Sequence, residues 1–179
     1  MIDRRAEIAE AFKKYFHHYG FKKTSVDDVA AELHISKKTI YEYFDSKEAV
    51  FVYIIQGEAE QAAKAMSRRL EGMTTATERM QMLVHLIFDN ASLYLKSGQG
   101  LDLHDRDDMA NMIFQTAYES ILLKVVIDGT QTGEFHLPDE ALSPLLLKAV
   151  IQQGLQVMRC DPDSRVEHPT TVAVLKLLA

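Results

Sequence analysis

Apolar side chains recur at three- and four-residue spacing through residues 8–19, the spacing that gathers them on one face of an α-helix. Asp3 stands before this stripe and is of a residue type that caps helix N-termini. Gly20 stands after it, where a glycine commonly ends a helix. The pattern therefore predicts a first helix between these two residues. Its inward face is predicted to be Ile8, Ala11, Phe12, Tyr15, Phe16 and Tyr19.

Two shorter helices are predicted between residues 25 and 44, because a serine able to cap a helix precedes each of two apolar patterns. The first follows Ser25 and points Val26, Val29, Ala30 and Leu33 inward. The second follows Ser36 and covers residues 37–44, with Ile40 and Phe44 inward. The turn between them is too short for a hairpin of long helices, so the second helix must cross the first steeply and project outward. That is the geometry of a helix-turn-helix.

The second short helix carries an unusual mixture of cations, hydroxyls and aromatic rings on its outward sides. These side chains are Lys37, Lys38, Thr39, Tyr41, Glu42 and Tyr43. Such groups suit the base edges and phosphates of DNA, although a solvated face with half-buried tyrosines would explain any one of them alone. Their combination with three successive helix caps favours a DNA-reading helix. The third cap, Asp45-Ser46, opens a long helix with Lys47 in its first turn, where the helix dipole also favours a phosphate.

Residues 21–48 strongly resemble the TetR family of bacterial transcriptional regulators. The segments T-S-V-x-D-V-A at 24–30, S-K-x-T-I-Y-x-Y-F at 36–44 and S-K-E at 46–48 occur in order and correctly spaced. The resemblance implies a three-helix reader that acts as a dimer, with its recognition helix in the major groove. It assigns DNA contacts to Thr24, Ser25, Val26, Ser36, Lys37, Lys38, Thr39, Tyr41, Glu42, Tyr43 and Lys47. Many relatives carry glycine where this chain has His34, and often a small residue where it has Lys38; Asp27 is not expected to touch phosphate directly.

Charge and composition exclude several classes of function. The chain has 20 Lys and Arg against 26 Asp and Glu, but residues 1–50 hold nine of each sign, so the excess acid lies beyond the predicted reader. The sequence contains no long apolar run and no signal-peptide pattern, so we expect a cytoplasmic protein without a membrane partner. It contains one cysteine and no nucleophile elbow, P-loop or paired-carboxylate signature. We therefore expect no enzyme, no cofactor and no metal.

Beyond residue 46 the apolar periodicity predicts further helices, so the expected fold class is all-α with about nine helices. We divide it into a helix-turn-helix DNA-binding domain over residues 1–46 and a helical regulatory and dimerisation domain over residues 47–179. The later helices are expected at about 46–73, 74–96, up to 128, 142–158 and 166–178. The loop from Asp128 contains G-x-x-x-G-E-F at residues 129–135, which again resembles the TetR family.

Two groups of side chains in the second domain are candidates for regulation. A pocket between the middle helices is expected to be lined by Met66, Phe88, Tyr94, Met112, Phe114 and Tyr118. Plain core packing is the simpler explanation at any single one of these positions. A four-helix dimer interface is expected from the apolar C-terminal helices, with Leu146, Val150, Gln153, Gly154, Val157 and Leu175.

The sequence thus predicts a DNA-binding transcriptional regulator. We expect a homodimeric repressor that binds a pseudo-palindromic double-stranded DNA operator and is released by a small apolar ligand. The alternative is an interaction protein of the same fold that is controlled by a partner protein or lacks an inducer.

Overall fold

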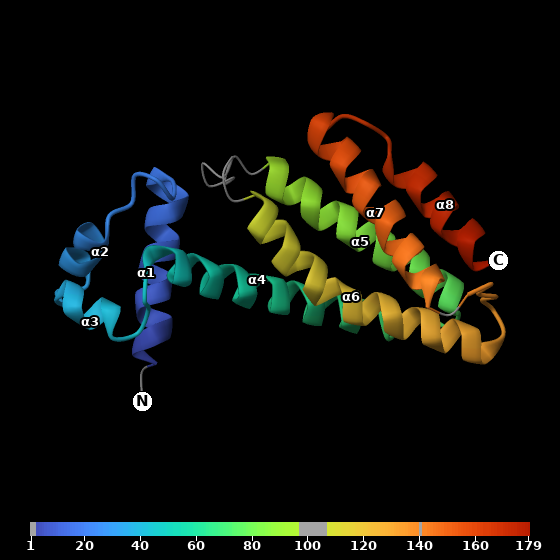
Figure 1. The fold of residues 1–179 in the computed structure, drawn as a ribbon, viewed down its shortest axis with the longest axis horizontal. Coiled ribbons are helices and arrows are strands. Elements are labelled where there is room, and N and C mark those ends of the chain that lie inside the picture. Colours follow the sequence, from blue (N-terminus) through green and yellow to red (C-terminus); the bar gives the residue numbers. More distant parts are fainter. Residues whose placement is uncertain (1–2, 97–106, 140) are drawn as a thin grey trace. The chain divides into compact units, whose positions relative to one another are not determined.

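Eight α-helices make up the described part of the computed structural model, which covers residues 3–96, 107–139 and 141–179 (Figure 1). They are α1 (Arg4–Tyr19), α2 (Val26–Glu32), α3 (Lys37–Tyr41), α4 (Lys47–Leu70), α5 (Ala76–Lys96), α6 (Asp107–Thr132), α7 (Leu142–Cys160) and α8 (Glu167–Leu178). These residues form no strand, so the all-α prediction is confirmed, and eight helices are close to the expected nine. In the same ranges, no helix has both the length and the apolar character that crossing a bilayer requires.

The chain divides into two compact units that share α4 and α6. One unit contains α1, α2, α3, the part of α4 up to Gln61 and the part of α6 up to Gln115. The other contains the rest of α4, α5, the rest of α6, α7 and α8. Each unit has buried apolar residues of its own, and we describe the two units separately.

Helix α1 begins and ends where its caps predict. The carboxylate of Asp3 accepts hydrogen bonds from two backbone N–H groups of the first turn, at 3.0 and 3.4 Å, and Gly20 follows the last turn with a φ of 83°. Of the predicted inward face, Ile8, Ala11, Phe12 and Phe16 are buried and Tyr15 is half-buried. Tyr19 is 52% exposed, so its prediction as an inward residue was wrong. Its ring packs instead along the helix against Tyr15, with ring centroids 5.5 Å apart.

The turn between α2 and α3 has the two backbone hydrogen bonds of a Schellman motif. Ile35 N–H donates to the Ala30 carbonyl at 3.0 Å, and His34 N–H donates to the Ala31 carbonyl at 3.1 Å. His34 has a φ of 53°, in the left-handed region that favours glycine. Glycine adopts this φ without strain, which explains why it suits this position. A histidine here lowers the stability of the folded protein, because its Cβ makes the left-handed conformation unfavourable.

Helix α3 is fastened to its unit by two buried side chains, Ile40 and Phe44, which are 1% and 3% exposed. Both were predicted to point inward. The helix is shorter than predicted, because its last turn tightens. Tyr43 N–H donates to the Ile40 carbonyl three residues earlier, at 3.0 Å, and the helix therefore ends at Tyr41.

Aromatic rings form the centre of this first core. Phe16 of α1, Phe21 of the following turn and Phe51 of α4 meet pairwise with ring centroids 5.2 to 6.2 Å apart. All three are at most 5% exposed. Tilted and edge-on contacts of this kind are favourable beyond the burial of the rings alone. The core thus joins α1, α4 and the turn that leads into α2.

In the second unit, α7 and α8 pack against each other and against α5, and the three helices run side by side in Figure 1. Gly154 of α7 makes this packing close. A Cβ at this position would overlap Oγ1 of Thr170 in α8 and lie 2.8 Å from Cζ of Phe88 in α5. The missing side chain therefore serves contacts within the chain.

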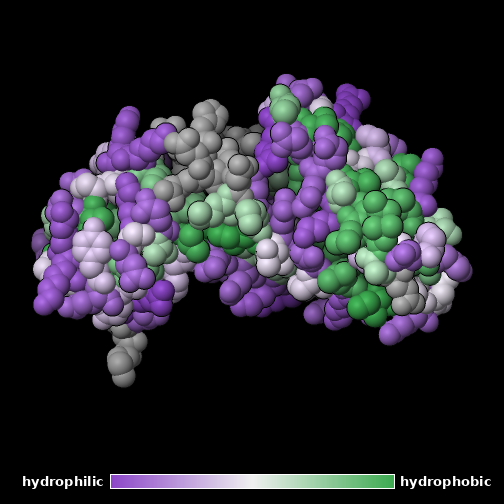
Figure 2. All heavy atoms as spheres, in the orientation of Figure 1, coloured by the Kyte–Doolittle hydropathy of each residue, from purple (hydrophilic) through white to green (hydrophobic). Residues whose placement is uncertain are grey.

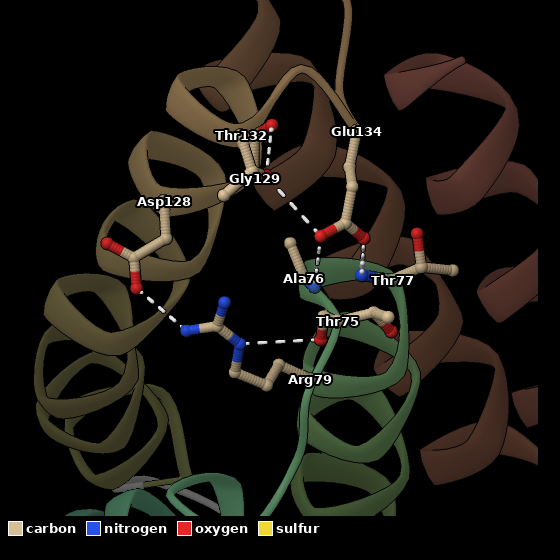
Figure 3. Close-up of polar contacts among 8 residues, drawn as sticks. All are labelled: Thr75, Ala76, Thr77, Arg79, Asp128, Gly129, Thr132 and Glu134. Carbon is tan, nitrogen blue, oxygen red and sulfur yellow. Dashed lines mark hydrogen bonds and ion pairs between the residues drawn. The ribbon is translucent and has the colours of Figure 1, made fainter.

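The G-x-x-x-G-E-F segment forms the end of α6, and each of its four fixed residues has a physical role (Figure 3). The helix was expected to end near Asp128 but continues to Thr132, because Gly129 is a helical residue. A Cβ on Gly129 would lie within 2.7 Å of three atoms of the Phe135 ring, which is 4% exposed. Gly133 then ends the helix with a φ of 77°.

Glu134 caps the start of another helix, α5. Its two carboxylate oxygens accept hydrogen bonds from the backbone N–H groups of Ala76 and Thr77 at 2.9 and 3.1 Å (Figure 3). These two bonds hold the pKa of Glu134 below its ordinary value. An ion pair of 2.8 Å between Arg79 of α5 and Asp128 of α6 lies beside this cap. The segment therefore fixes the end of α6 to the beginning of α5.

Candidate nucleic-acid interface

Helix α3 and the turn after it present charged and aromatic side chains to solvent. Lys37, Lys38, Tyr41, Glu42 and Tyr43 are all exposed. The exposed fractions of the two tyrosines are 47% and 40%, which is large for aromatic rings so close to a core. The cations and rings that sequence analysis singled out are therefore brought together on one short segment, which the buried side chains on its other side hold in place.

The serine caps of α2 and α3 form as predicted. Ser36 Oγ accepts a hydrogen bond from Thr39 N–H at 3.1 Å, and it lies 2.9 Å from the Thr39 hydroxyl. Ser25 Oγ accepts from Asp28 N–H at 3.1 Å and donates to the Asp28 carboxylate at 2.7 Å. Thr39, Ser25 and Val26 are half-buried, while Ser36 is exposed. The hydroxyls that were expected to meet DNA thus also fix the beginnings of both helices.

Thr24 differs from the expectation of a DNA contact. Its side chain is buried, with the residue only 2% exposed, and its hydroxyl donates to the Gly20 carbonyl at 2.9 Å. Its backbone N–H donates to the same carbonyl at 3.2 Å. The side chain of Thr24 therefore builds the turn between α1 and α2, and this burial leaves it no surface for a phosphate.

Lys47, in the first turn of α4, is joined to the same turn. Its ammonium donates to the backbone carbonyls of Phe21 and Thr24 at 2.8 and 2.9 Å, and it lies 4.4 Å from the centroid of the Phe21 ring. These bonds use two of the three donors of the ammonium. Sequence analysis expected Lys47 to bind phosphate. The structure adds a second task, because Lys47 also holds the turn before α2 against the start of α4.

An ion pair crosses from α2 to the first residue of α3. The ammonium of Lys37 lies 2.8 Å from the carboxylate of Asp27, which is the second residue of α2. The hydrogen bond and charge of Asp27 raise the pKa of Lys37 above its ordinary value. Sequence analysis assigned Lys37 to DNA but gave Asp27 no role. The sequence did contain an indication of this ion pair, because it places an acid and a cation at the starts of two helices that share a tight turn.

Arg5 makes an aromatic contact that the sequence did not predict. Its guanidinium lies 4.9 Å from the ring centroids of both Phe44 and Tyr53, so it is in contact with two aromatic faces. Contacts of this kind are attractive and hold the guanidinium in place. The first turn of α1 is thereby fixed to Phe44 and to α4.

The six residues expected to line a ligand pocket do not share one environment. Met66, Phe88 and Tyr118 are buried, Phe114 is half-buried, Met112 is 66% exposed, and the side chain of Tyr94 lies outside the described residues. Met112 is therefore too exposed to lie on the wall of an enclosed cavity. Burial raises the pKa of the Tyr118 phenol to about 12, so this hydroxyl stays protonated at neutral pH.

A cavity of about 570 Å³ lies elsewhere, in the first unit. Its lining residues are Tyr15, Tyr19, Lys23, Asp28, Ala31, Glu32 and His34. None of the six candidate pocket residues belongs to this lining. The sequence patterns gave no indication of it, because its walls come from α1, α2 and the turns after each of them.

Helix α7 is apolar on two faces. Leu147, Ile151 and Met158 are buried, on the face that also carries Gly154, while Leu142, Leu145, Leu146 and Val157, outside that face, are 38 to 59% exposed. Figure 2 shows hydrophobic surface gathered over α7 and the neighbouring part of α8.

Of the candidate dimer residues, Leu146, Gln153 and Val157 are exposed, Val150 and Leu175 are half-buried, and Gly154 is buried. The exposed members lie on or beside the outer apolar face. Gly154 has a different place from the expected one, because its close approach is to α5 and α8 of its own chain.

Comparison with known proteins identifies the segment that contains α1, α2 and α3. The sequence model of the family described as bacterial regulatory proteins, tetR family, matches residues 8–54. The HTH-type transcriptional regulator HbdR from Aromatoleum sp. (strain CIB) is 28% identical over 78 residues. That alignment covers 44% of this chain and 34% of HbdR. The chain thus matches about a third of the length of this curated relative.

Solved structures are similar over almost the whole chain. RolR in complex with resorcinol has a TM-score of 0.73 at 14% identity, covering 98% of this chain and 87% of RolR. The transcriptional regulator FadR from Bacillus subtilis, in complex with stearoyl-CoA, has a TM-score of 0.63 at 19% identity, covering 96% of each chain. At these identities the likeness concerns the fold alone, and it extends the similarity from the N-terminal helices to the helices of the second unit.

Proposed function

Since the N-terminal segment of this chain belongs to the TetR family of bacterial regulatory proteins, we propose that the protein is a DNA-binding transcriptional regulator. The observation that carries the proposal is the exposed face of α3 and of the turn after it. Lys37, Lys38, Tyr41 and Tyr43 face solvent there, while Ile40 and Phe44 are buried. A helix presented in this way can enter the major groove, where lysine donates to guanine acceptors and aromatic hydroxyls reach phosphates.

The charges of the N-terminal fifty residues fit this role. They balance within that segment, while the remainder of the chain is acidic. The excess acid therefore lies outside the segment that contains α1, α2 and α3, so net charge does not oppose binding of DNA to this segment. Ser36, Thr39 and Glu42 stay candidates for contacts beside the cations, and Ser25, Val26 and Lys47 stay candidates at the starts of α2 and α4.

We further propose that the protein acts as a homodimer through the outer face of α7. Exposed apolar side chains gathered on one helix face are typical of an interface rather than of a free surface. Leu146 and Val157 belong to this face and are 45% and 38% exposed. Two copies of α7 and α8 would form a four-helix interface, which fits an operator with two related half-sites.

Regulation by a small apolar ligand is the last part of the proposal. Structures of the same fold are complexes with resorcinol and with stearoyl-CoA, which supports a ligand-responsive second unit. The buried candidates Met66, Phe88 and Tyr118 supply apolar surface and one protonated hydroxyl. A ligand can release the operator only if it binds the non-binding arrangement of the dimer more tightly, since equal affinity for both arrangements shifts no equilibrium. A regulator that blocks transcription while it is bound and leaves its operator when the ligand binds acts as a repressor.

Selection of bound duplexes from a random pool tests the DNA-binding proposal. The parent protein is expected to enrich a pseudo-palindromic sequence. Tyr43→Ala is expected to weaken binding to all sequences, and Lys37→Ala is expected also to change the preferred base at one position of each half-site. Glu60→Gln, in an exposed residue of α4, is the control and is expected to bind like the parent. The proposal fails if no sequence is enriched, or if both α3 variants bind like the parent.

A further inference from the structure

The ion pair between Asp27 and Lys37 lies on the proposed DNA-binding surface. Its carboxylate and ammonium are 2.8 Å apart, and the two side chains are 69% and 49% exposed. Lys37 is the first residue of α3, and α2 and α3 lie next to each other in Figure 1. An acid is thus fixed beside the first cation of the segment that would meet DNA.

Folding alone gives little reason for this pair. Exposed ion pairs add little to stability, because solvent screens the charges and two long side chains lose freedom. A carboxylate on a DNA-binding surface also repels phosphates. If the surface only had to attract phosphates, Asp27 would weaken binding.

We propose that Asp27 is a specificity-determining residue, which orients Lys37 for base reading and prevents it from acting as a general phosphate contact. The inference rests on the proposed DNA-binding function. The Asp27 carboxylate occupies one of the three N–H donors of Lys37 and leaves two, and guanine offers two acceptors, O6 and N7, in the major groove. On other sequences the acceptors within reach of Lys37 are phosphate oxygens. The ion pair as a whole has no net positive charge, so it attracts these phosphates only weakly.

The remaining charges around the pair support this division of roles. Asp28, next to Asp27, accepts one hydrogen bond from the Ser25 hydroxyl and donates its backbone N–H to the same hydroxyl, so it belongs to the cap of α2. Lys38, next to Lys37, is exposed, and no ion pair among the described residues joins it to Asp27. Lys38 is therefore the general phosphate contact of the pair of lysines, and Lys37 is the one assigned to bases.

The size of the effect follows from counterion release. Each freed Lys37 that neutralises one additional phosphate changes the slope of log K against log salt by about −0.9. The proposed homodimer frees two, so the slope changes by about −1.8, which corresponds to about 30-fold tighter binding at about 0.15 M salt. This gain applies to any sequence. On the selected operator it is offset by loss of the orientation of Lys37, so the ratio of specific to non-specific affinity is expected to fall by about 30-fold.

The experiment compares binding of the full chain to a selected duplex and to a random-sequence duplex, by fluorescence anisotropy at several salt concentrations. Asp27→Asn is expected to bind the random duplex about 30-fold tighter, with a salt slope steeper by about 1.8 for the two protomers, and to bind the selected duplex within about twofold of the parent. Asp27→Glu keeps the charge and is expected to restore parent-like behaviour. Glu60→Gln, which removes one negative charge from α4, is expected to match the parent on both duplexes.

A double-mutant cycle assigns the effect to the pair. In a Lys37→Gln background, Asp27→Asn is expected to leave the salt slope unchanged, because the cation that it would free is absent. The inference is overturned if Asp27→Asn tightens both duplexes equally, if it leaves the random duplex unchanged, or if its effect persists without Lys37. A parent protein that enriches no sequence would refute the proposed function itself, which is a different result from any of these.

Discussion

Replacing Gly129 by alanine tests whether the contact between α6 and Phe135 is as close as the structure shows. Gly129 lies inside α6, and a Cβ there would come within 2.7 Å of three atoms of the Phe135 ring. Carbon atoms in proteins normally pack 3.5 to 4.0 Å apart, so the ring must move by about 1 Å or more. Phe135 is 4% exposed, and because protein interiors are closely packed, such a movement is expected to disturb its neighbours.

Two opposing effects set the expected magnitude. Alanine is favoured over glycine inside a helix by about 1 kcal/mol. Forcing additional volume into a packed core costs about 3 kcal/mol at the upper end of the usual range. We therefore expect Gly129→Ala to lower the free energy of unfolding by about 2 kcal/mol. Gly57 of α4 has no atom within 4 Å of its Cβ position, so Gly57→Ala is expected to raise it by about 0.5 to 1 kcal/mol.

Urea unfolding followed by circular dichroism measures both changes, at one protein concentration so that association does not alter the comparison. A double-mutant cycle isolates the ring. In a Phe135→Ala background, Gly129→Ala meets no ring atoms and is expected to stabilise the protein. The account of the segment is refuted if Gly129→Ala stabilises the parent as much as Gly57→Ala does, or if the cycle shows no coupling between residues 129 and 135.

Three further predictions concern a strained residue, a helix cap and the dimer. His34→Gly removes the cost of a left-handed φ but increases the entropy of the unfolded chain. Thermal unfolding should show a net stabilisation of about 0.5 to 1 kcal/mol, and a loss of stability would contradict this prediction. Because the folded pKa of Glu134 lies below the ordinary 4.5, its contribution to stability is complete above that value and is lost as pH falls through the folded pKa. The unfolding temperature of the parent should therefore fall more steeply between about pH 5 and pH 3 than that of Glu134→Gln, and parallel curves would exclude the cap. Leu146→Glu places a charge on the outer face of α7 and should shift sedimentation equilibrium toward the monomer, whereas Leu93→Glu, in an exposed residue of α5, should not; an unchanged dimer in the first variant would rule out this face.

The features that the sequence predicted well are those that depend on neighbours a few residues apart. Asp3, Ser25 and Ser36 cap their helices through bonds that reach only two or three positions along the chain. The inward positions of α3 follow in the same way from one apolar pair four residues apart, Ile40 and Phe44. The short motif that resembles the TetR family includes Ser25, Ser36, Ile40 and Phe44 but not Asp3, so both lines of reasoning led to α2 and α3.

The features that sequence analysis missed depend on residues brought together by the fold. Lys47 donates to a carbonyl 26 residues earlier, and Glu134 caps a helix 58 residues before it. The partners in both contacts are backbone groups, which leave no side-chain pattern in a single sequence. Tyr19 was misplaced for a related reason, because periodicity gives the face of a helix but does not show where the rest of the core ends.

The most direct test of the central claim is the pattern of backbone amide shifts in ¹⁵N-labelled protein when a selected duplex is added. The account predicts that the largest changes fall in the α3 segment, residues 36–43, and at the start of α2, with amides of the inner face of α7 much less affected. It would be contradicted if the duplex perturbed mainly residues 116–179 and left the α3 segment unchanged.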